Sequence, residues 1–320
     1  MNRARLLLGS LRKMSAMPAI LLFFALLVAN SFIMANSLSR SFLVSYLNNT
    51  TPVMCIAIGT SVVIICGEID ISLGAMLSVG NVLLIKLLGA GVPYQAAVVL
   101  VLAASMAMGL LNGFLIAAMR GSSLLTTFAT STIYSGLALL IMPVPGGSVA
   151  REMSRFYNGS LLGLPAAALF FMIPYAIWKI YKRTTHGMRL YAAGYDRNKA
   201  YVSGVNVTGE KIFAFVFAGF CAGMGALAIT SSLGAGDALI GAAMSMMAIS
   251  AAVIGGVSLS GGYGDVTGSL FGSLFLGLIT VSVLSSNVSP FVQQLASGLI
   301  LLFGMLGAMA FGMKSGKKRN

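Results

Sequence analysis

The chain has 320 residues, of which 58% are hydrophobic and only 8% are charged. A soluble globular domain usually carries about 25% charged residues, so this composition excludes one and indicates an integral membrane protein. The net charge of +13 does not indicate nucleic-acid binding. The basic residues are divided among separate short loops rather than gathered on one folded face, so we expect no nucleic-acid partner.

Ten apolar stretches have about the length, close to 20 residues, that a helix needs to cross a bilayer. In chain order they are Met17–Asn36, Leu43–Cys66, Ile71–Leu88, Tyr94–Met119, Ser122–Met142, Leu161–Tyr181, Lys211–Ser231, Leu239–Val257, Val266–Ser285 and Pro290–Phe311. The sequence therefore predicts an all-α polytopic membrane protein of about ten transmembrane helices, forming a single transmembrane domain over residues 1–320. The third and eighth stretches carry Gly and Ser, and we expect these two to be bent or partly re-entrant.

The charges predict which side of the membrane each loop occupies. When all ten stretches cross, sixteen of the twenty Lys and Arg fall on one side, and Arg40, Lys86, Arg151 and Arg155 fall on the other. Short basic loops stay cytoplasmic, so both termini should lie inside. The cytoplasmic segments are then the N-terminal tail 1–16, a central loop 182–210 and the C-terminal tail 312–320. The mixture of Ala, Tyr and charges in the central loop suits one or two short surface helices.

The scarcity of titratable residues argues against several kinds of chemistry. The chain has seven carboxylates and one histidine, His186, which falls in the central loop. Proton-coupled carriers usually need ionisable residues inside the bilayer, and here only Glu68, Asp70 and Lys86 come near it. The sequence has no grouped metal ligands, no Ser and His pairing and no complete phosphate-binding loop. We therefore expect no enzyme activity and no cofactor in this chain, and ATP, if used, to bind another subunit.

Four polar residues are candidates for a hinge or a solute path. Glu68 and Asp70 in the segment GEID stand at a predicted break between two helices, where a carboxylate can cap the next helix or line a polar passage. Asn81 and Asn112 lie within apolar helices, and an unpaired amide in hydrocarbon is costly. They should therefore bond to other helices or face a water-filled path.

A weak internal similarity joins two parts of the chain. The run Val62–Cys66, followed by GEIDISLG, is similar to the run Ala251–Ile254, followed by GGVSLSGG. Membrane transporters are often built from repeated halves with broken helices at corresponding places. Two related halves are therefore a further expectation.

Several collinear segments resemble one family. They are GEIDISLGAML, LLNGFLIAAMRGSSLLTTFATSTIYSGLAL, THGMRLYAAGYDRNKAYVSGVNV and ISAAVIGGVSLSGGYGDVTGSLFGSLFLGLI. Together they resemble the permease subunits of ribose-type sugar ABC importers, over residues 40 to 312. The chain departs from the family pattern where Glu68 replaces a usual Gly, and where Tyr195 and Asp196 stand in place of Gly and Asn.

The resemblance implies a function and a set of partners. The chain would be the pore-forming permease subunit of an ATP-driven importer in the cell inner membrane, among lipid. It would pair with a second permease subunit, identical or related, and work with cytoplasmic ABC ATPase subunits and a periplasmic or extracellular solute-binding protein. The central loop would couple to the ATPase through the residues that match the family pattern, Gly187, Ala193, Gly194, Ala200 and Gly204. The alternative is an ATP-independent secondary carrier or facilitator for a small polar solute.

Overall fold

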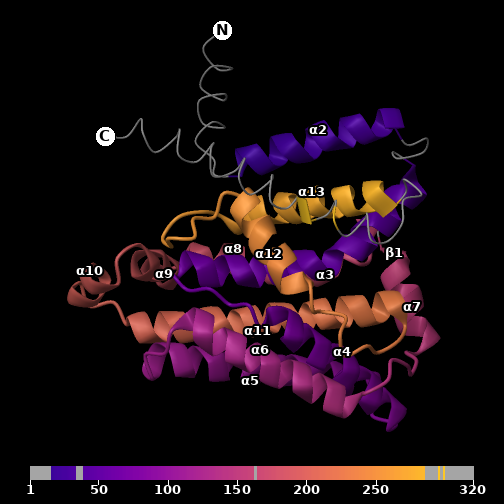
Figure 1. Ribbon diagram of the computed structural model, residues 1–320, viewed down its shortest axis with the longest axis horizontal. Coiled ribbons are helices and arrows are strands. Elements are labelled where there is room, and N and C mark those ends of the chain that lie inside the picture. Colours follow the sequence, from indigo (N-terminus) through magenta and orange to yellow (C-terminus); the bar gives the residue numbers. More distant parts are fainter. Residues whose placement is uncertain (1–15, 34–38, 162–163, 285–294, 296–297, 300–320) are drawn as a thin grey trace.

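The computed structural model describes residues 16–33, 39–161, 164–284, 295 and 298–299. The described chain is almost entirely helical, as the composition predicts (Figure 1). Four of its helical segments are long and apolar enough to cross a membrane alone, namely Arg40–Ile65, Tyr94–Ala118, Ser123–Ile141 and Val207–Leu233. The predicted tenth span and the two terminal tails lie almost wholly outside the described residues.

The described residues contain twelve α-helices, labelled α2 to α13, and one π-helical turn. The first group is α2 (Met17–Ile33), α3 (Arg40–Ile65), α4 (Leu73–Gly89), α5 (Tyr94–Gly113), the π-helical turn η1 (Phe114–Ala118), α6 (Ser123–Ile141) and α7 (Arg151–Asn158). The second group is α8 (Ala168–Lys182), α9 (Thr185–Tyr195), α10 (Arg197–Val202), α11 (Val207–Leu233), α12 (Met244–Ile254) and α13 (Val266–Leu284). Two short strands, β1 (Ser160–Leu161) and β2 (Leu164–Pro165), pair antiparallel.

The long helices lie roughly side by side in a bundle with two distinct ends (Figure 1). The short helices α9 and α10 occupy one end, which we call the α9 end. Helix α7 and strand β1 lie at the opposite end, which we call the α7 end. The two ends therefore carry different loops and different charges.

Helices α3 and α11 form the centre of the bundle. Every residue from Thr50 to Ile65 of α3 is buried, which is typical of a helix surrounded by others. Helix α11 packs closely on α5 because small residues let the two backbones touch: a side chain on Gly219 would overlap the Ser105 carbonyl oxygen. Helices α5 and α6 instead expose large apolar side chains such as Leu110, Phe128 and Leu140, as expected of surfaces in lipid or against another membrane subunit.

The eighth predicted span begins in a non-helical segment, whereas the third predicted span folds as the continuous helix α4 and is not bent as expected. Residues 66–72 are non-helical between α3 and α4, and residues 234–243 are non-helical between α11 and α12. We call these the first and second break segments. The predicted helix over Leu239–Val257 is wrong in extent, because α12 has 11 residues and so a length of about 16 Å, near half of the ~30 Å hydrocarbon core. The sixth span is also shorter than predicted, since Ser160–Leu161 pairs with Leu164–Pro165 before α8 begins.

The second break segment starts at the α7 end and leads to the α9 end. Gly146 and Gly236 exchange two backbone hydrogen bonds of 2.9 Å, which places the start of the segment beside the loop before α7. After α12, the Gly262 N–H donates to the Ile65 carbonyl oxygen at the end of α3, at 2.9 Å. The eighth span therefore runs between the two ends as a coil followed by a short helix.

The third and eighth spans cross through a reciprocal contact of glycines and serines. The Gly74 N–H donates to Ser245 Oγ at 2.7 Å, and the Gly241 N–H donates to Ser78 Oγ at 3.0 Å. A side chain on Gly74 would overlap the Gly241 carbonyl oxygen, and one on Gly241 would overlap the Gly74 carbonyl oxygen. The serines thus supply hydrogen-bond acceptors for backbone N–H groups in the bundle interior. Lipid could not supply such acceptors.

Candidate functional site

The central loop folds into two short helices, which confirms the expectation for residues 182–210. Thr184 caps α9, its hydroxyl accepting from the Gly187 N–H at 3.3 Å. Asp196 caps α10, its Oδ1 accepting from the N–H groups of Asn198 and Lys199 at 3.1 and 3.0 Å. Ser, Thr and Asp are preferred at this position because their side-chain oxygen accepts from an otherwise unpaired helix N–H. We call α9 and α10 together the α9–α10 hairpin.

The predicted coupling residues mostly lie at internal contacts of this hairpin. Ala193 and Ala200 are buried and pack with Val207 and Val205, so α9, α10 and the start of α11 share a small apolar cluster. A side chain on Gly187 would come within 2.6 Å of the Lys182 Cα and the Tyr181 carbonyl oxygen, so glycine permits the tight turn from α8 into α9.

Gly204 ends the hairpin. Its φ of 80° lies in the left-handed region, and its N–H donates to the Tyr201 carbonyl oxygen at 2.9 Å. No atom lies within 4 Å of the place where its side chain would be. The requirement for glycine here therefore comes from the backbone and not from packing.

Gly194 lies where three separate segments meet. A side chain on Gly194 would overlap the Ile65 carbonyl oxygen at the end of α3 and would lie 2.9 Å from the Gly262 nitrogen. A side chain on Gly261 would lie 2.5 Å from the Gly194 carbonyl oxygen and 2.8 Å from the Gly67 Cα. We call Gly67, Gly194, Gly261 and Gly262 the glycine junction. It puts the backbone of α9 in direct contact with the first break segment and with the loop 255–265.

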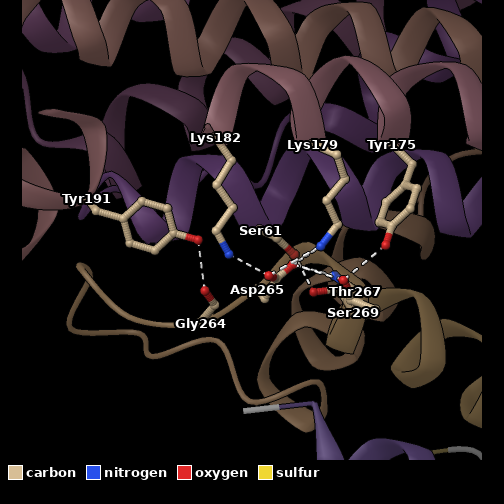
Figure 2. A network of polar contacts seen from close by, with 9 residues as sticks. All are labelled: Ser61, Tyr175, Lys179, Lys182, Tyr191, Gly264, Asp265, Thr267 and Ser269. Carbon is tan, nitrogen blue, oxygen red and sulfur yellow. Dashed lines mark hydrogen bonds and ion pairs between the residues drawn. The ribbon is translucent and has the colours of Figure 1, made fainter. Parts of the chain in front are cut away.

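A polar network around Asp265 makes a second connection at this end (Figure 2). Lys179 and Lys182 of α8 both form ion pairs with its carboxylate, Lys179 Nζ at 3.2 Å from Oδ1. The same Oδ1 accepts from the Thr267 N–H at 3.0 Å and so caps α13. The Tyr191 hydroxyl of α9 donates to the neighbouring Gly264 carbonyl oxygen at 2.8 Å. The network therefore joins α8, α9 and α13.

Hydrogen bonds and the two lysine charges stabilise the ionised form of Asp265. Burial would raise the pKa of this carboxyl, but the hydrogen bonds from Lys182 and the Thr267 backbone, with the lysine charges, lower its pKa to about 2. Asp265 is therefore ionised at neutral pH and attracts both lysines.

Glu68 and Asp70 both lie in the first break segment, but their contacts differ. Glu68 forms an ion pair with Lys211 near the start of α11. Asp70 is fully buried, and its Oδ1 accepts from the Ser72 N–H at 2.8 Å and from the Ser72 hydroxyl at 2.6 Å. Asn112 of α5 donates to the same Ser72 hydroxyl at 2.8 Å. Asp70 and Asn112 thus fix the turn that precedes α4.

Asn81 makes the corresponding hydrogen bonds that fix the second break segment. Its Nδ2 donates to Thr230 Oγ1 at 2.7 Å and to the Ala235 carbonyl oxygen at 3.2 Å. Its Oδ1 accepts from the Asp237 N–H at 2.7 Å. A cavity at the α7 end is lined by Ile85, Lys86, Met142 and Gly146 among others, and none of the four polar candidates lines it. In this conformation Glu68, Asn81 and Asn112 make contacts between segments, while Asp70 bonds to Ser72 within the first break segment. A role of the four residues in the solute path stays a prediction.

Sequence reasoning did not single out Asp265, Lys179, Lys182 or Lys211. The sequence did carry a signal for Asp265, because an Asp immediately before an apolar run is typical of a helix N-terminus. Lys211 had none, since 143 residues separate it from Glu68.

These features define a class of protein. An apolar helical bundle with two non-helical break segments, next to which two spans cross through small residues, is typical of membrane transporters. The model of the family described as "Branched-chain amino acid transport system / permease component" matches residues 42–313. The chain belongs to this family and is a multi-pass permease component of the inner membrane.

Individual relatives cover most of the chain. The ribose import permease protein of Bacillus subtilis (strain 168) is 31% identical over 255 residues, which are 78% of this chain and 79% of the relative. The ribose import permease protein of Haemophilus influenzae is 28% identical, over 85% of this chain and 86% of the relative. The D-allose transport system permease protein of Escherichia coli (strain K12) is 29% identical, over 85% and 82%.

Proposed function

We propose that this chain is the pore-forming permease subunit of an ATP-driven ABC importer for a sugar or sugar-like solute. The relatives named for ribose and D-allose, each similar over more than three quarters of this chain, support the solute class. The observation that carries the mechanism is the glycine junction, where the α9 backbone touches the first break segment and the loop 255–265. A movement of α9 therefore cannot leave these two segments in place.

The distribution of charge supports an orientation. The α9 end holds Lys179, Lys182, Arg183, Arg189, Arg197, Lys199 and Lys211, while Arg40, Lys86, Arg151 and Arg155 belong to the opposite end. By the positive-inside rule the α9 end is cytoplasmic. With about ten crossings, both terminal tails, 1–16 and 312–320, are then cytoplasmic, and residues 1–320 form one transmembrane domain whose coupling loop is 182–210.

The reciprocal contact of Gly74 and Gly241 supports two related halves. Both halves contain a long helix, a break segment and a shorter helix, and in both a serine follows the contact glycine by four residues. The long helices α3 and α11 end at opposite ends of the bundle, so the halves are inverted relative to each other. The sequence similarity between GEIDISLG and GGVSLSGG has another origin, because Gly67 and Gly256 both terminate helices at the α9 end with φ of 84° and 82°.

The exposed face of the α9–α10 hairpin is the proposed contact for a cytoplasmic ABC ATPase. Tyr195, Tyr201 and Val202 are 79%, 74% and 86% exposed there, which leaves large side chains available to a partner. ATP binding would displace the hairpin, and the glycine junction and the Asp265 network would pass the movement to α3, α4 and α13. A solute-binding protein would deliver solute at the opposite, external end, and a second permease subunit would complete the path.

Purification from native membrane tests this proposal. The tagged chain is isolated in mild detergent, and its partners are identified by mass spectrometry. We expect an ATP-binding subunit to co-purify, with ATP-dependent uptake after reconstitution of the assembly. A chain that purifies alone and moves solute in liposomes without ATP would contradict the proposal in favour of a facilitator or secondary carrier.

A further inference from the structure

A buried lysine and a largely buried carboxylate meet where the first break segment reaches α11. Glu68 lies three residues after the end of α3, and Lys211 lies near the start of α11. Their side chains form an ion pair and are only 14% and 9% exposed. Removal of one member of such a pair leaves the other charge buried and uncompensated, which is strongly unfavourable. The break segment and the start of α11 are therefore kept together as long as both charges are present.

Glu210, the residue before Lys211, contacts α8 and α9 instead of the first break segment. Glu210 is 5% exposed, and its Oε2 accepts from the Tyr181 hydroxyl of α8 at 2.6 Å. Its Oε1 lies 3.0 Å from Nδ1 of His186 in α9. Two consecutive residues of α11 thus connect the α9–α10 hairpin on one side and the first break segment on the other.

Aromatic packing supports the same turn of α11. The rings of Tyr181 and Phe213 are stacked, with centroids 4.0 Å apart. Helix α8 is therefore packed against the part of α11 that carries Glu210 and Lys211. Because Glu210 and Lys211 are consecutive residues of the same packed helix, a displacement of α9 that moves Glu210 also moves Lys211.

We propose that the Glu68–Lys211 pair is a positioning element that transmits displacement of the α9–α10 hairpin to the first break segment, and so keeps ATP hydrolysis coupled to solute movement. This inference rests on the proposed importer function. It assigns roles to Lys211 and Glu210, which act through the break segment and not through contact with solute. A purely structural role of the pair predicts something different, namely a change in the amount of folded protein without a change in coupling.

The test measures solute taken up per ATP hydrolysed by the complete transporter in proteoliposomes. The informative variant is E68Q/K211M, which removes both charges and leaves no buried charge unpaired, so it is expected to fold even where E68Q or K211M alone does not. We expect its uptake-to-hydrolysis ratio to fall by about fivefold or more, the lower end of typical coupling between sites. K211R keeps the charge and should retain a ratio close to that of the wild type. E152Q, at the opposite end in α7, is the matched control for loss of a carboxylate.

The outcomes distinguish a failure of the proposed role of the Glu68–Lys211 pair from a failure of the proposed importer function. An unchanged ratio in E68Q/K211M overturns the role of the pair, even if E68Q and K211M alone are defective, because the defect then comes from an unpaired buried charge. A ratio in K211R as low as in E68Q/K211M also overturns it, because the charge would not be what matters. A wild-type assembly without ATP-dependent uptake contradicts the proposed function itself.

Discussion

The Gly74 N–H donates a hydrogen bond of 2.7 Å to Ser245 Oγ, across 171 residues of sequence. The Gly241 N–H donates the counterpart bond to Ser78 Oγ at 3.0 Å. Each bond joins the third span to the eighth, and both serines are buried. The crossing therefore fixes the position of α4 relative to the second break segment and α12 in the interior of the bundle.

Loss of either serine hydroxyl should destabilise this crossing. S78A and S245A each leave a buried backbone N–H without its acceptor, which costs about 1–3 kcal/mol. We expect the unfolding temperature of the detergent-solubilised protein to fall in both variants. S231A is the matched control, because the buried Ser231 hydroxyl donates to the Leu227 carbonyl oxygen of its own helix, and its loss strands no N–H group. Equal stability of S78A, S245A and S231A would contradict the role of the crossing.

A methyl group at Gly194 should separate the hairpin from the helix bundle. In G194A the new side chain would overlap the Ile65 carbonyl oxygen, which is backbone and cannot rotate away. Overpacking of this kind costs about 1–3 kcal/mol or more, so ATP-dependent uptake should fall by about tenfold or more at unchanged membrane insertion. G136A in α6 meets no atom within 4 Å and should transport normally. Normal uptake by G194A would exclude the junction as the coupling contact.

The uptake of Gly204 variants should depend on how well the new residue tolerates a positive φ and not on the size of its side chain. A side chain here meets open space, but the φ of 80° disfavours β-branched residues most and Asn least. We expect G204N to keep more uptake than G204V, although Asn is no smaller than Val. Comparable loss in both variants, with normal insertion, would indicate that a partner surface and not the backbone conformation requires glycine.

The Asp265 network should contribute stability that disappears in acid. The pKa of Asp265 is lowered from 3.8 to about 2, so its ion pairs contribute fully above pH 3.8 and are lost as pH falls toward 2. Wild-type stability should therefore decrease more steeply than that of D265N between these two pH values. The measurement is thermal unfolding of both proteins in detergent over this range.

A second comparison separates the charge of Asp265 from its cap. D265N keeps an acceptor for the Thr267 N–H but loses the attraction to Lys179 and Lys182, whereas D265A loses both. At neutral pH D265A should be less stable than D265N by about 1 kcal/mol, the typical value of a helix cap. Identical stability of the two variants would show that the cap of α13 contributes nothing.

Apolar length and charge were sufficient to predict the membrane class and most helices. The long helices α3, α5 and α6 begin and end within a few residues of the predicted spans, because each is apolar over a full crossing. The short helices α9 and α10 followed from the composition of the central loop. These features depend on neighbours in sequence, which is why the sequence alone reveals them.

The two break segments were only partly predictable. Gly and Ser indicated bending in the third and eighth stretches, which is wrong for the third, since it folds as the continuous helix α4. The extent of the second break segment depends on Asn81 and Ser78, more than 150 residues away. The Lys211 partner of Glu68 is similarly remote. In such contacts, backbone groups and charged side chains find their partners on elements that are distant in sequence. A single sequence does not show which of these elements meet.

Site-specific cross-linking tests the central claim most directly. Cys55, Cys66 and Cys221 are buried, so a cysteine introduced at Val202, which is 86% exposed on α10, provides an accessible thiol at the α9 end. We predict that in native membranes V202C cross-links to an ATP-binding subunit, while V144C, 73% exposed at the α7 end, does not. Cross-linking of V144C and not of V202C to that subunit would contradict the proposed coupling surface and its orientation.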